Sequence, residues 1–567
     1  MLISELLKIE LKKILETDLS RAESRDEFSV SVSPRLEFGD YTTNAAFILA
    51  KQRQQSPFLV AEDIKKDLGQ KLGKYFSKIE IKNGYLNFFL SREFLVETLN
   101  KSPQEILKPK TPKKVIVEYS SPNIGKQLSV AHIGSTIIGD ALTRIYKFSG
   151  HKVITDSHLG DWGMLAGKLI AAYKKYSKTP LTKITIQEMN ELYVRFTTLE
   201  KEDEKLIESA KQETVKLQKH DKENLKVWRT LLKNSLKEFN KNYKILGTLP
   251  FDFQHGESFY QKYSEKVVED FKKKRWAKQS QGALIVELEN LPPVLIQKTD
   301  EAFLYATSDL GTIIQRQKAY HPDLVLYVVA NEQALHFEQV FAIAKKFKLA
   351  PKTELKHVKF GMLLGADHKK LSTRRGKSIL LEDVLEEAFT RAKEIAGSKK
   401  PGLSAASLKK IFWSVGIGAI KYNYLSQNRQ TDIVFDWDKM LSLEGNSSPY
   451  IQYSFARLSS ILKKSGQKSV KLELKDIEFL SEGEINLLRK LVQFPEVVFE
   501  AAFDYLPNLV ANYVFELASL ANSFYEKYPV LQAKENEKKS RLKLIALAAA
   551  TIKNSLSLFG IESFERI

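Results

Sequence analysis

The sequence predicts an α/β protein built on an open parallel sheet and followed by a helical C-terminal region. Three observations predict this class. The β-branched run at 115–117 indicates a buried strand, and a polar loop, a helical pattern and a second strand at 151–155 follow it. The apolar run at 324–329 indicates a further strand. From residue 445 onward the pattern is helical to the end of the chain.

The composition limits the kinds of protein that the chain can be. Its 567 residues are enough for two to four domains, and 43% hydrophobic residues are enough for their cores. Cysteine is absent, which excludes disulfides, cysteine-ligated zinc and thiol chemistry. The nine histidines are scattered, so no protein-built metal site is expected. No apolar run reaches the length of a membrane span, and the acids within residues 1–20 argue against a transit peptide.

The formal net charge of +19 is spread over the predicted helices and is not concentrated in a tail. A folded surface with this charge favours a polyanionic partner, such as a structured nucleic acid, over a membrane. The alternative is a lysine-rich surface that is only solvated, and the charge alone leaves both interpretations open.

Residues 1–100 predict a small α/β domain that begins with an amphipathic helix. Residues 83–90 indicate a turn followed by a strand. Within this strand Tyr85 could stack on an unpaired base with Asn87 hydrogen-bonding beside it, or it could be an ordinary strand aromatic. Three prolines among lysines then indicate a stiff linker at 101–114.

The central candidate site is the loop that joins the strand at 115–118 to the helix that follows it. In an open parallel sheet such loops lie at the carboxyl edge, where ligands bind, and a helix N-terminus there suits a phosphate. The alternative is an ordinary strand–helix connection with a satisfied histidine. The polar side chains available for a phosphate are Lys126, Ser129, His132, Ser135 and Thr136.

A second group of candidates follows a long segment, 165–245, whose helical periodicity and Lys/Glu content indicate solvated helix faces. Tyr305 and Asp309 are four residues apart on a predicted helix, so a phenol and a carboxylate could address one ligand, or they form a plain surface pair. Gln333 follows the strand at 324–329, at its carboxyl edge. The glycine-flanked cationic loop at 368–377 could close on a phosphate chain, although most basic loops are only solvated.

The last segment, 431–567, predicts an all-helical domain. Tyr450, Tyr453 and Arg457 share one face of a helix by their spacing. Aromatic rings beside an arginine form a platform on which unpaired bases can stack. The alternative is that one or both tyrosines belong to the helical core.

Taken in order, these motifs resemble the signatures of the arginyl-tRNA synthetase family of class I aminoacyl-tRNA synthetases. Glu118, the segment 121–124, Lys126, His132 and the segment 135–140 stand in the family's order, as do 158–163 and the segment 256–260. The loop at 368–377 resembles the second signature of the class. The resemblance covers nearly the whole chain.

Two departures from the class pattern concern the phosphate site. Ser129 and Ala131 replace the first His and the Gly of the family's His-x-Gly-His element. Ser129 is shorter than His and uncharged, and Ala131 adds a methyl group where the family packs adenine. Thr373 replaces the second Lys of the cationic loop, and Lys126, just upstream of the His element, takes the place that many arginyl enzymes give to a Lys.

The resemblance implies a Rossmann-like parallel-sheet catalytic core at 115–430 with a helical insertion at about 165–290. It also implies an α/β N-terminal domain at 1–100 that holds the tRNA elbow, and an all-α anticodon-binding domain at 431–567. The implied activity is that of an arginine–tRNA ligase, a cytoplasmic monomer that uses L-arginine, ATP with Mg²⁺, and tRNA(Arg). It further implies that the cognate tRNA must be bound before arginine is activated.

The resemblance assigns roles to individual residues, with no metal held by the protein itself. Four are expected to act in catalysis: Lys126, His132, Lys370 and Ser372. The expected ATP-binding residues are Ser129, Ala131, His132, Ser135, Gly160, Asp161, Lys370, Leu371, Ser372, Thr373 and Arg374. Arginine is expected to contact Glu118, Asn123, Tyr305, Asp309 and Gln333, and tRNA to contact Tyr85, Asn87, Tyr450, Tyr453 and Arg457. In this scheme the guanidinium lies between the carboxylates of Glu118 and Asp309.

Two alternative functions stay open at this point. A tRNA-binding paralogue with weak or no ligase activity would explain the departures at Ser129 and Ala131. A class I enzyme for another amino acid is disfavoured because Tyr305, Asp309 and Gln333 stand together.

Overall fold

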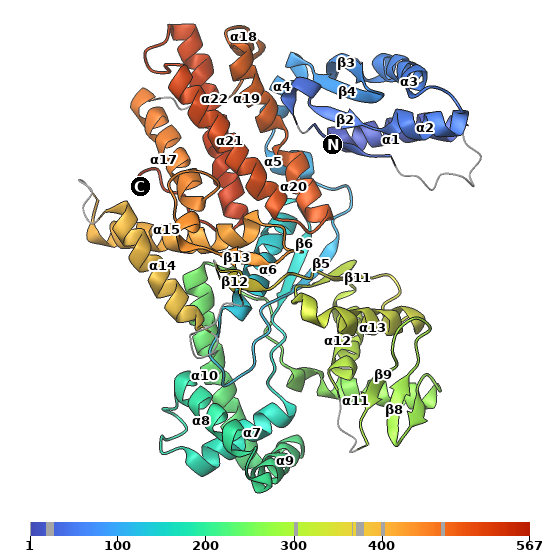
Figure 1. Cartoon of the computed structure of the whole chain (residues 1–567), viewed down its shortest axis with the longest axis vertical. Coiled ribbons are helices and arrows are strands. Elements are labelled where there is room, and N and C mark those ends of the chain that lie inside the picture. The colour runs from blue at the N-terminus through green and yellow to red at the C-terminus, as the bar shows by residue number, and fades with distance from the viewer. Residues whose placement is uncertain are drawn as a thin grey trace.

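The computed structural model describes residues 2–18, 28–33, 35–299, 304–365, 367–369, 379–397, 403–466 and 471–567. Figure 1 shows a small N-terminal domain beside a helical C-terminal domain, with the parallel sheet beneath them and two further lobes below it. Among the described residues, no helix is long and apolar enough to cross a membrane.

The N-terminal domain is an antiparallel sheet of order β1-β2-β4-β3 packed against helices. Its core contains Leu7, Leu49, Ile64, Leu86 and Phe88, all fully buried. Two of these residues lie on β4, whose pleat turns one face to the helices. The elements are α1 (Ile3–Asp18), β1 (Val30–Val32), η1 (Leu36–Phe38), β2 (Tyr41–Thr43), α2 (Ala45–Arg53), α3 (Pro57–Leu72), β3 (Phe76–Lys82) and β4 (Tyr85–Leu90).

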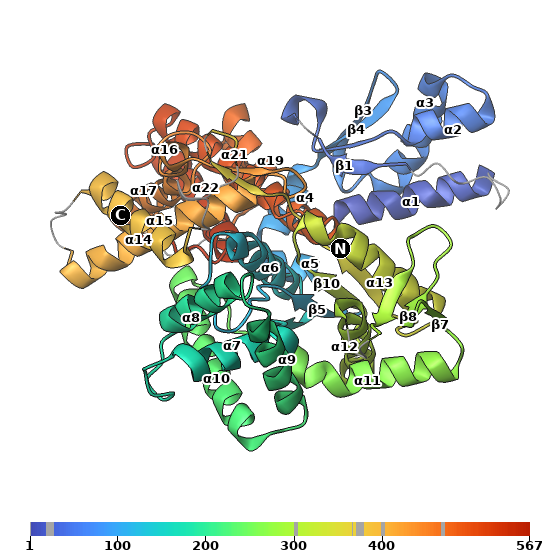
Figure 2. The same ribbon diagram turned by 60° about the horizontal axis from the view of Figure 1, so that its bottom comes forward.

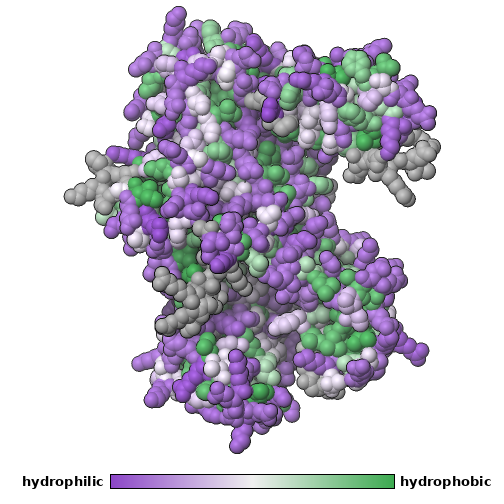
Figure 3. Space-filling model, viewed as in Figure 1, coloured by the Kyte–Doolittle hydropathy of each residue, from purple (hydrophilic) through white to green (hydrophobic). Residues whose placement is uncertain are grey.

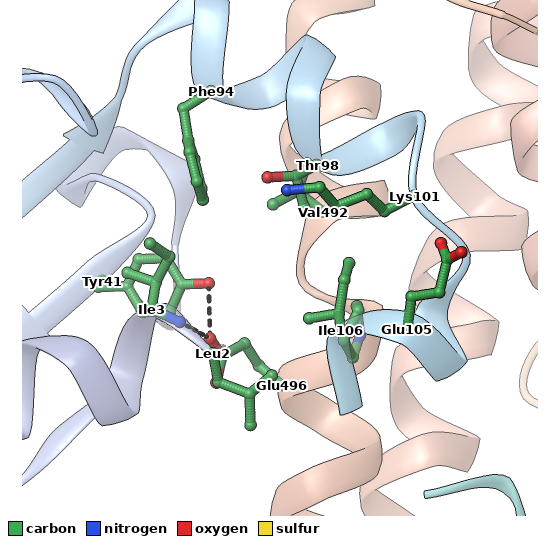
Figure 4. Close-up of a pocket in the computed structure, with 11 residues that line it drawn as sticks. Leu2, Ile3, Tyr41, Phe94, Thr98, Lys101, Glu105, Ile106, Val492 and Glu496 are labelled. Carbon is green, nitrogen blue, oxygen red and sulfur yellow. Dashed lines mark hydrogen bonds between the residues drawn. The ribbon is translucent and has the colours of Figure 1, made fainter. Parts of the chain in front are cut away.

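A buried carboxylate fastens this domain to the C-terminal domain. Glu496 accepts hydrogen bonds from the backbone N–H groups of Ile3 and Ser4, at 2.6 and 3.1 Å, and from the hydroxyl of Tyr41, at 3.3 Å (Figure 4). It therefore satisfies free N–H groups at the start of α1, where a negative charge also suits the helix dipole. Nearby, Arg489 donates to Asp40 at 2.7 Å.

Two short helices join the N-terminal domain to the sheet, α4 (Arg92–Leu99) and α5 (Pro103–Leu107). The predicted linker at 101–114 therefore contains a helix. The sequence explains it, because Ser102 and Glu105 form a capping box and Pro103 occupies the first helical position.

The centre of the molecule is a parallel sheet of order β11-β10-β5-β6, with β5 (Lys114–Glu118), β6 (Lys152–Asp156), β10 (Leu324–Tyr327) and β11 (Glu354–His357). Alternate residues of β5 face opposite sides. Val115 and Val117 pack with α6 (Ala131–Phe148), and Ile116 packs with α12 (Tyr305–Tyr320) and α13 (Ala334–Lys346). Burial on both faces explains the unbroken β-branched run. Figure 2 shows α6, β5 and β10 at the centre of the molecule.

The insertion has two parts. The first is a helical bundle of α7 (Gly163–Tyr176), α8 (Ile186–Leu199), α9 (Glu204–Gln218) and α10 (Lys222–Leu246). The second begins with α11 (Glu257–Lys273) and continues as an antiparallel sheet of β7 (Lys278–Ser280), β8 (Ala283–Val286) and β9 (Val294–Gln297). The strands of this sheet lie near the end of the segment that the sequence predicts to be a helical insertion.

The C-terminal part joins the core through the parallel pair β12 (Leu363–Gly365) and β13 (Ile433–Phe435) and through α14 (Leu381–Ala396) and α15 (Ala405–Ser426). The helical domain then follows as α16 (Trp437–Met440), α17 (Ser448–Ser465), α18 (Leu474–Glu478), α19 (Glu482–Val492), α20 (Phe494–Phe503), α21 (Asn508–Lys527) and α22 (Glu535–Leu558). The face in Figure 3 is mostly hydrophilic, in keeping with charge spread over the helices.

A buried cluster of polar side chains joins the C-terminal end of the chain to α6. Asp140 of α6 is fully buried and accepts from Arg144, at 2.8 Å, and from the N–H of Leu249, at 2.8 Å. Lys421 of α15 lies 3.7 Å from the same carboxylate and donates to the carbonyl of Gly560 at 3.0 Å. Burial lowers the pKa of Lys421 to about 8.

Candidate functional site

The site is organised by three residues that end neighbouring strands. Tyr327 of β10 is paired with Glu118 of β5, and Glu118 with Asp156 of β6, so all three stand in one row at the carboxyl edge of the sheet. This is the edge at which open parallel sheets bind ligands. The loops that follow β5, β6 and β10 therefore converge there.

The two carboxylates of this row are already paired with a residue of the chain. Arg316 of α12 is 1% exposed, and its Nη2 atom lies 2.6 Å from Glu118 and 2.8 Å from Asp156. Tyr260 also donates to Asp156, at 3.1 Å. Burial opposes the charge of Arg316, but the carboxylates, Glu118 first, hold its pKa above the ordinary value. This arrangement makes Glu118 part of the floor of the site and does not favour it as a direct arginine ligand.

Asp309 lies on α12 and faces α13. Its carboxylate is 2.6 Å from Nε2 of His336, and both side chains are partly exposed. Tyr305 is the first residue of α12 and is 74% exposed. Gln333 is exposed in the short helix η2 (Asn331–Gln333), just before α13. The pairing with His336 sets the position of Asp309, a role for this histidine that the sequence alone does not reveal.

Glu257, the first residue of α11, is a further acidic group of the site. Burial raises its pKa to about 7, with nearby His158 opposing the shift and the carboxylates of Asp161 and Asp309 adding to it. Glu257 in turn raises the pKa of Tyr305, after the effect of burial. The sequence motif at 256–260 contains Glu257. Nothing in that motif indicates that Asp309, about 50 residues further along the chain, raises the pKa of Glu257.

Asp161, expected to bind ATP, caps α11 instead of facing the site openly. It is 1% exposed, and it accepts from the backbone N–H of Ser258 at 2.9 Å and from its hydroxyl at 2.6 Å. A Cβ atom on Gly256 would lie 2.2–2.4 Å from this carboxyl group, so only glycine fits there. Burial raises the pKa of Asp161. Its carboxylate is therefore used to place Glu257 at the site.

Gly160 also helps to position another residue of the site, Asn123. It forms a bridge with Asn123, and the N–H of Ile124 donates to the carbonyl of Gly160 at 3.0 Å. A Cβ atom on Gly160 would lie 1.8 Å from Oδ1 of Asn123. The absence of a side chain at Gly160 thus leaves room for the amide of Asn123.

His132 lies in the first turn of α6, and Ser129 holds its ring. The backbone N–H of Ser129 donates to Nδ1 of His132 at 3.1 Å, and the Ser129 hydroxyl lies 3.2 Å from the same atom. Burial lowers the pKa of His132, and the charge of Lys126 lowers it further. The neutral ring with Nδ1 as acceptor carries its proton on Nε2, where it can be donated to a phosphate oxygen.

Ala131 and Ser135, two further candidate residues near the start of α6, have different surroundings. Ala131 is exposed, so its methyl group lies on the open side of α6. Ser135 donates to the carbonyl of Val328 at 2.6 Å and accepts from the N–H of Ser120 at 2.9 Å. Its hydroxyl thus ties α6 to the end of β10.

Lys126 lies on the loop after β5, and its Nζ atom is 4.5 Å from the ring centre of Tyr193 in α8. Of the cationic loop, His368 and Lys369 are exposed. The backbone of 379–381, directly after this loop, pairs with 128–130: Val130 N–H donates to Ile379, and Leu381 N–H donates to Leu128. The segment that follows the loop therefore lies beside the start of α6. Lys370, Leu371, Ser372, Thr373 and Arg374 lie outside the described residues.

The residues expected to contact tRNA are divided between surface and interior. Tyr85 is 44% exposed and Arg457 is exposed, whereas Asn87 is only 5% exposed within β4. Tyr450 is half-buried, and its hydroxyl accepts from Asn522 at 3.0 Å. Tyr453 is half-buried too. Burial does not favour Asn87 as a base contact, and Tyr450 belongs in part to the packing of α17 against α21.

Three family models match the chain. The arginyl tRNA synthetase N-terminal domain matches residues 3–90, the catalytic domain of class I tRNA synthetases (R) matches 95–437, and the DALR anticodon binding domain matches 451–567.

Curated proteins and solved structures agree with these matches. The arginine–tRNA ligase of Fusobacterium nucleatum is 38% identical over 543 residues, which cover 94% of each chain, and that of Escherichia fergusonii is 37% identical over 95% of this chain and 96% of its own. The arginyl-tRNA synthetase structure from Plasmodium falciparum aligns with a TM-score of 0.84 at 25% identity, covering 100% of this chain and 99% of that one. The structure from Thermus thermophilus, at 23% identity, covers 100% of both chains with a TM-score of 0.81 and supports the fold. The predicted fold class is confirmed, and the chain belongs to the arginyl-tRNA synthetase family of class I aminoacyl-tRNA synthetases.

Proposed function

We propose that this protein is an arginine–tRNA ligase that activates L-arginine with ATP and transfers it to tRNA(Arg). One observation carries the proposal furthest. The loop with Lys126 and the helix start with His132 stand at the same sheet edge as the acidic pair Asp309 and Glu257. One edge of the sheet thus offers donors for a phosphate and acceptors for a cation.

Asp309 and Glu257 are proposed to bind the guanidinium group of arginine. A guanidinium is planar and carries five donors, so carboxylates supply matching acceptors. The acidic pair replaces the scheme in which Glu118 supplies one carboxylate, because Glu118 is paired with Arg316. Polar recognition of this kind rejects neutral amino acids strongly. Tyr305, Asn123 and Gln333 remain predicted arginine contacts.

In the first step an arginine carboxylate oxygen attacks the α-phosphorus of ATP, and the bond to pyrophosphate breaks. Nε2–H of His132 and the ammonium of Lys126 would donate to phosphate oxygens, so that developing charge is stabilised without a covalent enzyme intermediate. In the second step a hydroxyl of the terminal adenosine of the tRNA attacks the arginyl carbonyl, and AMP leaves.

Mg²⁺ is proposed to accompany ATP. Among the residues that the structure describes, no group of three or more His, Asp or Glu side chains could hold a metal ion. The ion would therefore be held chiefly by phosphate oxygens and would supply charge neutralisation there.

The hydrogen bonds from Ser129 to His132 bear on the alternative of an inactive tRNA-binding paralogue. Ser129 lacks the imidazole of the family's pattern. It nevertheless holds His132 through Nδ1, which leaves the Nε2–H group of His132 available to donate. The two curated relatives, from Fusobacterium nucleatum and Escherichia fergusonii, are both called arginine–tRNA ligases. We therefore propose an active enzyme. The roles of the loop 370–374 and of the tRNA contacts, the monomeric state and the cytoplasmic location remain predictions.

The decisive test is arginine-dependent exchange of pyrophosphate into ATP, with and without tRNA(Arg). We expect exchange with arginine alone among the amino acids, and only when the tRNA is present. Asp309→Asn should raise KM for arginine by about 10- to 100-fold, as expected for the loss of a charge-assisted hydrogen bond, with KM for ATP unchanged. Exchange with another amino acid would refute the specificity, and its absence under every condition would favour the paralogue.

A further inference from the structure

The loop that carries Lys126 is held by the insertion and not by the sheet. Ile124 is fully buried in the core of the helical bundle, with Leu169 of α7 and Leu231 of α10. The N–H of Gly125 donates to the hydroxyl of Ser235 in α10 at 2.9 Å. The bundle therefore fixes the backbone of the two residues directly before Lys126.

Gly125 explains how closely the loop approaches the bundle. Its φ is +70°, and a Cβ atom at this position would lie 2.6–2.7 Å from the methyl groups of Leu169. Only glycine combines this left-handed backbone with such a close approach. The direction of the next residue is thus set by contact with α7.

The bundle also reaches the end of the Lys126 side chain. Tyr193 of α8 is half-buried, and its ring lies 4.5 Å below Nζ of Lys126. Tyr193 is close enough to Tyr305 to raise the pKa of that phenol, after the effects of burial and of Glu257. Tyr193 thus contacts the Lys126 ammonium and also acts electrostatically on the phenol at the start of α12.

We propose that Tyr193 is a positioning residue of the activation site: its ring holds the Lys126 ammonium at the mouth of the site, where a triphosphate can take it up. The inference rests on the proposed function, because it assumes that Lys126 meets ATP. A lysine has four rotatable bonds and loses much freedom when it is held. A cation over an aromatic face is favoured, which lowers the cost of ordering it before ATP arrives.

The proposal requires the aromatic face and not the hydroxyl. Tyr193→Phe should therefore retain activity, and Tyr193→Leu, which keeps an apolar side chain without a π face, should raise KM for ATP by about 3- to 10-fold. KM for arginine should stay within about twofold of its value in the unchanged protein. The affinity for ATP, measured by calorimetry, should fall by the same factor. This measurement does not depend on catalytic turnover.

A double-mutant cycle with Lys126 decides whether the two side chains act together. In a Lys126→Met background, Tyr193→Leu should have no further effect on ATP binding. The matched control is Tyr176→Leu, because Arg195 lies 4.4 Å from the ring of Tyr176 in the same bundle, and this pair is not part of the proposed site. The control variant should bind ATP as the unchanged protein does.

Three results would overturn the inference: equal losses in Tyr193→Phe and Tyr193→Leu, an equal loss from Tyr193→Leu with and without Lys126, or a loss matched by Tyr176→Leu. Lack of arginine-dependent exchange in the unchanged protein, with ATP binding still coupled to Tyr193, would refute the proposed function alone.

Discussion

At the scale of single residues, the site is defined by how its charges are paired. Arg316 is shared by the buried carboxylates of Glu118 and Asp156, and His336 holds Asp309, so the acidic groups differ in their availability to a ligand. A buried carboxylate that is hydrogen-bonded to an internal cation is less available to a ligand than a partly exposed one. The partly exposed Asp309 is then the acid best placed to select a cation.

Arg316→Met tests the buried ion pairs. The change leaves two buried carboxylates without a cation, so we expect the free energy of unfolding of the core to fall by about 3–5 kcal/mol. Urea denaturation followed by tryptophan fluorescence would measure it. Arg35→Met breaks an exposed pair with Glu37 and should cost less than about 1 kcal/mol. Similar losses in the two variants would show that the Arg316 pairs are not structural.

The raised pKa of Glu257 predicts how arginine binding depends on pH. A carboxyl group with an ordinary value of 4.5 and a folded value of about 7 is still largely protonated at slightly acid pH. It becomes an effective cation ligand only as the pH rises through 7. The same shift makes this group's contribution to folding stability fall as pH rises from 4.5 to 7, because the folded state disfavours the charged form.

KM for arginine should therefore fall several-fold between about pH 6 and pH 8, while KM for ATP serves as the internal reference. Glu257→Gln should give a high KM that no longer changes over this range. A pH profile that is the same in both proteins would exclude Glu257 as the titrating group.

At the scale of elements, loops from distant parts of the chain position one another. The loop after β6 contributes Gly160, which accommodates Asn123 of the loop after β5, and Asp161, which caps α11. The segment 379–381 pairs with 128–130 next to His132. Geometry at the site thus depends on contacts between loops more than on any one helix or strand.

Gly160→Ala tests this dependence. The added methyl group would collide with Oδ1 of Asn123, so the amide must rotate, and we expect KM for arginine to rise by about 10-fold with little change in KM for ATP. Steady-state exchange kinetics would measure both. Gly69→Ala in α3 is the matched control, because nothing lies within 4 Å of its added atom; it should leave KM unchanged and stabilise α3 by about 0.5–1 kcal/mol.

At the scale of the whole molecule, the N-terminal domain is joined to the C-terminal domain by Glu496 (Figure 4). Burial raises the pKa of this carboxyl group, and the hydrogen bonds from Ser4, Ile3 and Tyr41 oppose the shift. The placement of a domain proposed to bind tRNA therefore depends in part on one buried acid of α20, together with the Arg489–Asp40 pair.

Glu496→Ala should loosen the N-terminal domain, because the first N–H groups of α1 lose their acceptor at a cost of about 1–3 kcal/mol. We expect faster tryptic cleavage among the lysines at 101–114 and a raised KM for tRNA, with pyrophosphate exchange at saturating tRNA preserved. Glu500→Gln, one helical turn further on, is the control and should be cleaved as slowly as the unchanged protein. Unaltered cleavage in Glu496→Ala would show that other contacts hold the domain.

The sequence predicts the sheet and the loop between β5 and α6 well, because β-branched runs and the Pro and Gly that follow them are local signals. It does not predict that Glu118 pairs with Arg316 or that Asp161 caps α11, since the partners are about 200 and 100 residues apart and lie in segments whose pattern is only helical. Asn87 looks available in the alternation of β4, on the face opposite Leu86 and Phe88, but it is only 5% exposed. Such pairings arise from tertiary packing, which short-range spacing cannot encode.

The polar cluster around Lys421 connects the C-terminal residues of the chain to helix α6. Asp140 is nine residues after Ala131, about 13 Å along α6 from the turn that bears His132. A protein truncated before Gly560 would keep a buried ammonium group with one carbonyl fewer around it. Because that ammonium faces Asp140, losing a few final residues would disturb the helix that bears His132, the residue proposed to contact ATP.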